Sequence, residues 1–306
     1  EAAYYLMVMG QALRAQGKLE KAVGKLEKAL GILKETLGPG KVSVQMTHAL
    51  DQTAVCYCEQ GQLDKAREMM TEALRIRRII CGDDSDEVAA ALGNLGNIVK
   101  KQGMLAEARA HFEETLGIHR RLHGEKHPDV GGLLSNIANI LSEEGQLDEA
   151  LKLHKKALKI RRRAYGEDHQ EVASTVLNIG TVFRKQGKHD EALEVYEEAL
   201  GIYARALGID HRECASVHHN IAAAKRDSGD VAGALGSARE AVRIYTMHGV
   251  NDSSSQNAVD LLRELEGTRK EAAGRAGRKA RGVLFFQRCV EAPGGAWPVR
   301  HGDSYV

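Results

Sequence analysis

Aromatic residues and proline are scarce in this sequence, and their scarcity narrows the fold class. Aromatic side chains make up 4% of the 306 residues, and only four prolines occur. Leucine, alanine, glutamate, lysine and arginine are abundant instead. This composition is typical of helical, solenoid-like proteins, so we expect an all-α protein.

Cysteines are few, long apolar runs are absent and the net charge is close to zero, and each of these features argues against one class of protein. Five cysteines, an odd number at positions 56, 58, 81, 214 and 289, do not form a disulfide framework and indicate a reducing, cytoplasmic setting. No run of about eighteen apolar residues occurs, which excludes a membrane-spanning helix. The net charge of +1 argues against a general polyanion binder. The chain opens at Glu1 inside an amphipathic pattern and has no signal peptide, so we expect a fragment of a longer protein.

A glycine followed five residues later by alanine recurs through most of the chain. The pairs are Gly17/Ala22, Gly61/Ala66, Gly103/Ala108, Gly145/Ala150, Gly187/Ala192 and Gly229/Ala234. Successive glycines are 44, 42, 42, 42 and 42 residues apart. A fixed period of this length indicates stacked supersecondary units, each of which uses its neighbours as its core. We therefore expect one continuous array rather than separate globular domains.

Hydrophobic periodicity around each of these glycines predicts two helices joined by a tight turn. The predicted helices cover residues 2–16, 18–37, 42–60, 62–81, 86–102, 105–122, 129–144, 147–165, 171–186, 189–207, 213–228 and 231–248. Beyond residue 248 the period fails, and a further helix is expected at 256–270. We predict six helical hairpins over residues 1–249, a linker and capping helix over 250–280, and a basic, Gly-rich, disordered tail over 281–306.

One side of the first helix in each hairpin is apolar, with a small residue seven positions before the turn glycine. In the third hairpin this side consists of Leu92, Leu95, Gly96 and Val99. The pattern around the glycine and the alanine resembles the tetratricopeptide repeat, and the 42-residue period with the connectors GEKHP, GEDHQ and GIDHR is similar to the repeats of kinesin light chains. The resemblance implies a right-handed superhelical solenoid of antiparallel helix pairs, whose first helices line a concave, protein-binding wall.

The opposite side of these first helices carries asparagine at regular positions. Nine residues before the turn glycine stand Asn94, Asn136, Asn178 and Asn220, and six residues before it stand Asn97 and Asn139. The resemblance places this stripe on the concave wall. A carboxamide both donates and accepts hydrogen bonds, which suits the backbone of an extended peptide. The alternative interpretation is that these side chains hydrogen-bond between adjacent repeats.

Basic residues lie close to the asparagine stripe. Lys100, Arg184 and Arg226 stand three residues before the turn glycine, and Lys101 and Lys185 stand two before it. The former series makes the wall locally basic, which favours an acidic peptide. The latter position alternates in sign from repeat to repeat, in the order Glu59, Lys101, Glu143, Lys185 and Asp227. Such alternation also fits a ladder of ion pairs between neighbouring repeats, whose helices pack about 8–10 Å apart.

Other candidate sites are weaker. His127, His169 and His211 share the 42-residue spacing and are interpreted as connector residues, not as metal ligands. Paired or tripled arginines near the ends of the second helices, at 77–78, 120–121 and 161–163, are interpreted as compensating the helix dipole rather than binding nucleic acid. The sequence contains no phosphate loop, no nucleophile with a base at an interpretable spacing and no paired catalytic carboxylates, so we expect no enzyme activity, no cofactor and no metal.

The sequence therefore predicts a non-catalytic scaffold or adaptor in the cytoplasm, resembling the cargo-binding repeats of kinesin light chains. Its expected partner is a protein that offers an extended, acidic peptide segment to the groove, and neither a small-molecule substrate nor a membrane is expected. The alternative is a sensor or regulatory array of a larger signalling enzyme, for example one with a fused ATPase, whose catalytic domain lies outside this chain.

Overall fold

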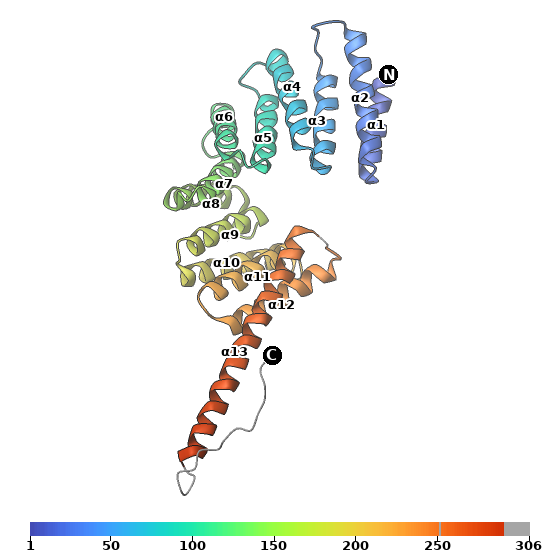
Figure 1. The fold of residues 1–306 in the computed structure, drawn as a ribbon. Helices are drawn as coiled ribbons and strands as arrows, with labels where there is room; N and C mark the ends of the chain where they lie inside the picture. Colours follow the sequence, from blue (N-terminus) through green and yellow to red (C-terminus); the bar gives the residue numbers. More distant parts are fainter. Residues whose placement is uncertain (251, 291–306) are drawn as a thin grey trace. The chain divides into compact units, whose positions relative to one another are not determined.

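Helices form all of the regular structure in the part of the chain that the computed structural model describes, residues 1–250 and 252–290 (Figure 1). In chain order they are α1 (Ala2–Ala15), α2 (Leu19–Leu37), α3 (Val44–Glu59), α4 (Leu63–Cys81), α5 (Asp86–Lys101), α6 (Leu105–His123), α7 (Pro128–Glu143), α8 (Leu147–Tyr165), α9 (Gln170–Lys185), α10 (His189–Leu207), α11 (Arg212–Asp227), α12 (Val231–Met247) and α13 (Ser253–Val290). The predicted all-α class is confirmed. The ends of α1 to α12 agree with the predicted ends within two residues.

The chain consists of two compact units. The N-terminal unit, Glu1–Gln186, contains α1 to α9, and the C-terminal unit, Gly187–Val306, contains α10 to α13. Each unit is described by itself below. Within the described residues, no helix combines the length and the apolar character needed to cross a membrane.

Glycine makes the tight turn inside each hairpin. The six turn glycines have φ between 72° and 88°, in the left-handed region where a Cβ atom is unfavourable. At Gly103, for example, the backbone N–H groups of Gly103 and Met104 donate to the carbonyl oxygens of Lys100 and Val99, at 2.9 and 3.0 Å. These bonds satisfy carbonyl groups that the end of α5 would otherwise leave unpaired.

Small residues on the first helix of a hairpin let the second helix approach closely. Gly96 on α5 faces Phe112 on α6 so closely that a Cβ atom at residue 96 would lie 2.9 Å from the ring atom Cε1. Gly10 on α1 faces Leu26 on α2 in the same way, with 2.7 Å to Cγ. Ala150 on α8, at the position of the repeated alanine, is fully buried. The repeated small residues therefore set the distance between paired helices.

The odd-numbered helices of the N-terminal unit form its inner layer. Each second helix also packs against the first helix of the next hairpin, which joins the hairpins into one array with a continuous apolar core. In addition the backbones of α1 and α3, and those of α7 and α9, approach each other closely, whereas α4 and α6 are joined through long side chains, in the ion pairs Arg67–Glu107 and Arg78–Glu114. The odd-numbered side is therefore the more tightly curved one.

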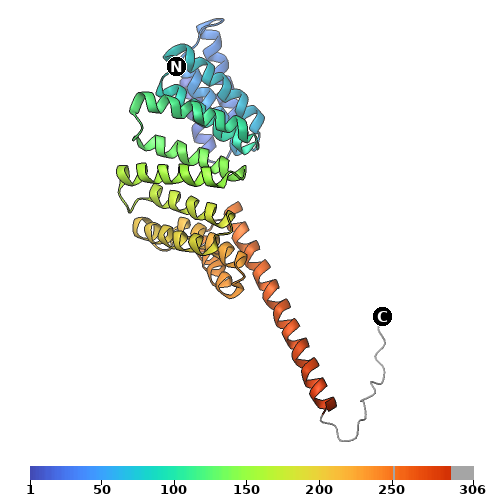
Figure 2. The same cartoon turned by 90° about the vertical axis from the view of Figure 1, so that its left-hand side faces the viewer.

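In the C-terminal unit, α13 covers the last hairpin. Leu261 and Leu265 are buried against Ala222 and Leu235 of α11 and α12, and Asp252 caps the start of α13 by accepting the N–H groups of residues 254 and 255 at 2.9 and 3.0 Å. Beyond this contact the helix extends away from α11 and α12 (Figure 2).

The final helix is longer than predicted. It begins at Ser253 and continues to Val290, where the sequence predicted a helix over 256–270 and a tail without regular structure from 281. The physical reason is that the first proline after Ser253 stands at position 293, while alanine, arginine and lysine outweigh the scattered glycines in between. Residues 291–306 of the predicted tail lie outside the described residues.

Candidate functional site

A hollow of about 380 Å³ lies between α3 and α5 on the inner layer of the N-terminal unit. Its lining residues are Asp51, Ala54, Val55, Cys58, Glu59, Met70, Asn94, Asn97, Ile98 and Lys101. Ala54, Met70 and Ile98 are buried and make the lining partly apolar. We call this hollow the α3–α5 groove. It contains three residues that the sequence predicted for peptide binding, Asn94, Asn97 and Lys101.

The predicted asparagines of the N-terminal unit lie on successive odd-numbered helices. Asn94 and Asn97 on α5 are exposed, while Asn136 and Asn139 on α7 and Asn178 on α9 are half-buried. None of these five side chains makes a hydrogen bond to another described residue. The bonds between adjacent repeats that the alternative interpretation requires are therefore not formed by these side chains, and their carboxamides are available to a ligand.

Asn220, on α11 of the C-terminal unit, is engaged within its own helix. Its Nδ2 donates to the carbonyl oxygen of Ser216 at 2.9 Å. The carbonyl oxygen of its side chain is the part that remains to accept a bond.

Charges on the inner layer are joined in pairs from one hairpin to the next. Arg14 on α1 pairs with Glu59 on α3 at 2.8 Å, and Lys100 on α5 pairs with Glu143 on α7 at 3.1 Å. Each pair joins the residue three before one turn glycine to the residue two before the next. The structure thus contains inter-repeat ion pairs in a diagonal register, and they compensate the charge of Lys100.

The other predicted basic residues differ in whether their side chains already form hydrogen bonds or ion pairs. Lys185 donates to the carbonyl oxygen of Ser142 at 2.9 Å. Arg226, in the C-terminal unit, pairs with Asp227 at 2.9 Å and with Glu264 of α13 at 3.2 Å. Arg184 is half-buried and already engaged. Lys101 is exposed and makes no ion pair within the described residues.

The acids at the rim of the α3–α5 groove are compensated by arginine. Asp51 pairs with Arg77 of α4, and Glu59 pairs with Arg14. Because both carboxylates already have a partner, the uncompensated charge at the rim is the ammonium group of Lys101. The electrostatics of the groove therefore favour an anionic ligand group.

Cys58 contributes to the groove as a neutral thiol. Burial raises the pKa of this thiol, and the nearby Lys101 opposes the rise only in part. A thiol with a raised pKa stays protonated at neutral pH and behaves as a small apolar group. Cys56, Cys58, Cys81 and Cys214 are all free thiols.

Six of the seven arginines that the sequence places at the ends of the second helices form ion pairs, and the exposed Arg163 forms none among the described residues. The pairs in the N-terminal unit are Arg77–Asp51, Arg78–Glu114, Arg120–Glu125, Arg121–Asp84, Arg161–Glu171 and Arg162–Glu167. A surface compensated in this way has little excess charge to offer a phosphate backbone.

The three connector histidines cap helices. The Nδ1 atoms of His127, His169 and His211 accept the backbone N–H two residues later, at 3.4, 3.2 and 3.3 Å. These bonds satisfy the first turns of α7, α9 and α11 and account for the 42-residue recurrence of histidine.

Two further histidines lie outside the repeat pattern. His119 and His123 stand one turn apart at the end of α6, and His123 Nε2 lies 2.6 Å from Asp86 Oδ1 of α5. The signal for this pair in the sequence is the spacing H-x-x-x-H, which places both rings on one face of a helix. The prediction from the sequence considered only the histidines that recur every 42 residues and therefore missed this pair.

The family model described as tetratricopeptide repeat matches the chain in five overlapping segments, residues 1–79, 45–121, 87–131, 129–205 and 171–247. No curated protein sequence matches the chain.

Several solved structures share the fold. BtubC (BKLC) from P. vanneervenii is 20% identical over 76% of this chain and 93% of its own, with a TM-score of 0.63. A chain from Podospora anserina, described as a kinesin light chain with nearly identical repeats, is 18% identical over 69% of this chain and 100% of its own, with a TM-score of 0.57. RapI in its apo form is 14% identical over 90% and 100%, with a TM-score of 0.62. At these identities the likeness concerns the fold, and at that level the predicted resemblance to kinesin light chain repeats is confirmed.

Proposed function

The chain belongs to the tetratricopeptide repeat family, and on that premise we propose that it is a non-catalytic adaptor that holds an extended, acidic peptide segment of a partner protein in the α3–α5 groove. The family fold implies a scaffold for protein interaction. The finer assignment depends on the groove, and its main support is the row of carboxamides on α5, α7 and α9 that have no hydrogen-bond partner among the described residues.

Carboxamides spaced along adjacent helices suit the backbone of a peptide. Each one can accept a peptide N–H and donate to a peptide carbonyl without regard to the ligand's side chains. Asn94 and Asn97 stand at the rim of the α3–α5 groove, so a peptide bonded to them passes over its partly apolar lining. An apolar side chain of the peptide fits into the groove between Val55 and Ile98, where its burial would contribute about 1.5–3 kcal/mol.

Charge sets the expected sequence of the ligand. Lys101 lies in the groove and has no ion-pair partner among residues 1–250 and 252–290, while the neighbouring acids Asp51 and Glu59 are paired with arginine. We therefore expect an aspartate or glutamate in the peptide next to the apolar side chain. We also assign the protein to the cytoplasm, a proposal that the free thiols support.

The test begins with selection of peptides from a random library on the immobilised full chain. Enriched peptides are expected to combine an apolar residue with neighbouring acids. Binding of one synthetic peptide of this kind is then measured by fluorescence anisotropy. Asn97→Ala should weaken binding by about 1–3 kcal/mol, because a buried peptide group loses its partner, and this loss should depend little on salt. Lys101→Glu should weaken binding through charge, so its effect should shrink above about 0.1 M salt, where the Debye length falls below about 10 Å.

Asn257→Ala on α13, an exposed asparagine outside the groove, is the matched control and should leave affinity unchanged. The melting temperature of every variant is measured alongside. If Asn97→Ala lowers the melting temperature and leaves the affinity of the folded protein intact, the asparagines are structural and the groove assignment is wrong. Enrichment of basic or uncharged peptides would contradict the assigned role of Lys101.

A further inference from the structure

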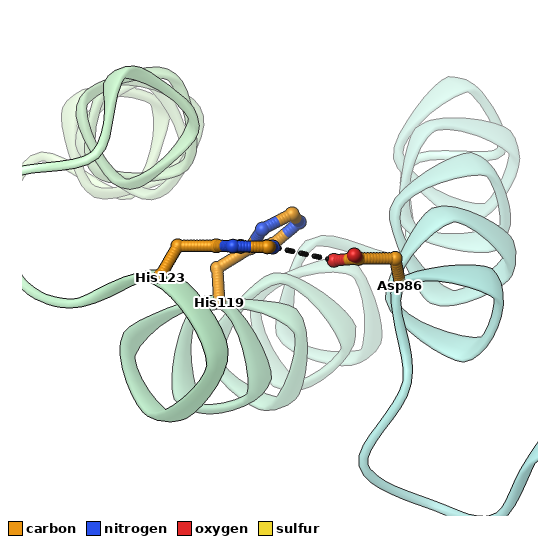
Figure 3. A group of neighbouring side chains, drawn as sticks. All are labelled: Asp86, His119 and His123. Carbon is orange, nitrogen blue, oxygen red and sulfur yellow. Dashed lines mark hydrogen bonds and ion pairs between the residues drawn. The ribbon is translucent and has the colours of Figure 1, made fainter.

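Two histidines and an aspartate meet where α5 begins and α6 ends. Figure 3 shows the rings of His119 and His123 close together and directed toward the carboxylate of Asp86, which projects from the facing helix. His123 Nε2 lies 2.6 Å from Asp86 Oδ1, and the ring centres of the two histidines are 5.5 Å apart. Three groups of the kind that ligate metals therefore converge from two helices.

The repeat architecture does not require these histidines. The equivalent residues in the neighbouring hairpins are Arg77 and Arg161 in place of His119, and Cys81 and Tyr165 in place of His123. Arg161 pairs with Glu171 at 2.7 Å, and the ring of Tyr165 stacks on His169 with 4.4 Å between centres. Other side chains thus fulfil the packing role at both positions, and the pair of histidines is an addition particular to the third hairpin.

The geometry suits a small ion. One ligand atom each from Asp86, His119 and His123 can be chosen so that all lie within 4.8 Å of one another. A tetrahedral ion with bonds of about 2.0–2.1 Å holds its ligands about 3.3 Å apart. The side chains therefore need to shift by about 1.5 Å or less, which rotation of the exposed Asp86 and the half-buried His123 allows.

His119 supplies an independent observation. Its Nδ1 is buried and has no hydrogen-bond partner in the part of the chain that the structure describes, and the Asp129 carboxylate is 3.9 Å away. His119, His127 and Asp129 form a second group whose ligand atoms also lie within 4.8 Å of one another. A buried polar atom without a partner is unfavourable, and a cation coordinated by Nδ1 of His119 would remove that deficit.

We propose that Asp86, His119 and His123 bind a first-row transition-metal dication of the Zn²⁺ class, with solvent at the remaining position. Two imidazoles and one carboxylate select zinc, cobalt or nickel over magnesium and calcium, which prefer oxygen ligands. On binding, the hydrogen bond between His123 and Asp86 breaks, the neutral imidazole carries its proton on Nδ1, and the lone pairs of Nε2 and the carboxylate oxygen donate to the ion. Because Asp86 opens α5 and His123 closes α6, the ion clamps the open end of the third hairpin.

The test uses the full chain without a polyhistidine tag. Calorimetry with Zn²⁺ alone should show one ion per chain, and Zn²⁺ but not Mg²⁺ should raise the melting temperature, because the ion binds only the folded hairpin. The double variant His119→Arg with His123→Tyr carries the residues that the fourth hairpin has at the same positions, so its fold should be retained. It should bind Zn²⁺ at least about 10-fold more weakly, as loss of even an outer-shell partner typically does.

His169→Ala is the matched control, since this histidine caps α9 as His127 caps α7 but has no equivalent pair beside it. It should leave Zn²⁺ affinity unchanged. The Co²⁺ form should show a spectrum of nitrogen and oxygen ligands without a thiolate charge-transfer band. The proposal is overturned if the wild-type chain does not bind Zn²⁺, if the double variant binds it equally well, or if the Co²⁺ spectrum shows thiolate ligands. Asp86→Asn, a smaller change, must also weaken binding.

Discussion

Replacing His154 by methionine should stabilise the protein and remove the part of its acid sensitivity that comes from this histidine. His154 lies on α8 and is fully buried, and neither of its ring nitrogens has a hydrogen-bond partner within the described part of the chain. It stands nine residues after its turn glycine, the position that Met70 occupies in the second hairpin, and the small residue facing that position is alanine in both hairpins, Ala54 and Ala138. Methionine therefore fits the available space and lacks the unsatisfied polar atoms.

The size of the effect follows from the protonation of His154. Burial, with a smaller contribution from Arg161, lowers the pKa of this histidine to about 4. Above pH 6.5 the ring is neutral in both the folded and the unfolded chain, and the folded protein loses nothing. As the pH falls from 6.5 towards 4 the unfolded chain takes up a proton that the folded chain refuses, so stability is lost. Each pKa unit corresponds to about 1.4 kcal/mol, so the loss at pH 4 is about 3 kcal/mol.

At pH 7 the variant should gain about 1–3 kcal/mol, because two buried nitrogens without partners are removed. Urea denaturation followed by circular dichroism at pH 7.5, 6.0, 5.0 and ~4.5 tests both effects. The difference in free energy of unfolding between His154→Met and the wild type should grow as the pH falls. His48→Met on α3, where the histidine is exposed, is the matched control and should change neither quantity appreciably. Parallel pH curves for wild type and His154→Met would refute the assigned cause.

Two further predictions concern the packing of the hairpins. Gly96→Ala should lower the free energy of unfolding by about 1–3 kcal/mol, because the new Cβ would lie 2.9 Å from Phe112. Gly93→Ala on the same helix meets nothing within 4 Å and should raise that free energy by up to about 1 kcal/mol. Equal melting temperatures for the two variants would contradict the close approach of α5 and α6. Deleting residues 256–306 should expose the apolar face that Leu261 and Leu265 cover and fray α11 and α12; hydrogen exchange should show protection lost there and retained in α5 to α8, and uniform loss would contradict a modular stack.

The periodic features of this protein could be predicted from its sequence. The turn glycines, the small residues between paired helices and the ends of α1 to α12 recur at a fixed period, and each reports a contact inside a hairpin or with the next one. Because a repeat array contains few contacts beyond nearest neighbours, a local pattern is enough to predict its register. The capping histidines belong to the same class, since each bonds a backbone group two residues away.

Features that break the period could not be predicted in the same way. Lys100 pairs with Glu143 of the next hairpin. The sequence showed charges three and two residues before each turn glycine, but it did not show that a residue of the first series pairs with one of the second. His154 occupies an apolar position, and only packing shows that both of its nitrogens lie without partners. The final helix continues past its predicted end because local propensity, not the repeat, determines where it stops.

The candidate sites likewise combine features that the sequence predicts with features that it does not. The sequence by itself determined that asparagines recur on one face of the first helices, since a helix of 3.6 residues per turn fixes which side chains share a face. Only the tertiary structure decided that the carboxamides on α5, α7 and α9 lack partners among the described residues and that Asp86, at the opposite end of the hairpin's chain from His119, lies against the histidine pair. The physical reason is that the spacing of residues in the sequence determines in which direction a side chain leaves its own helix. Which residue it then contacts depends on how the neighbouring helix packs against that side.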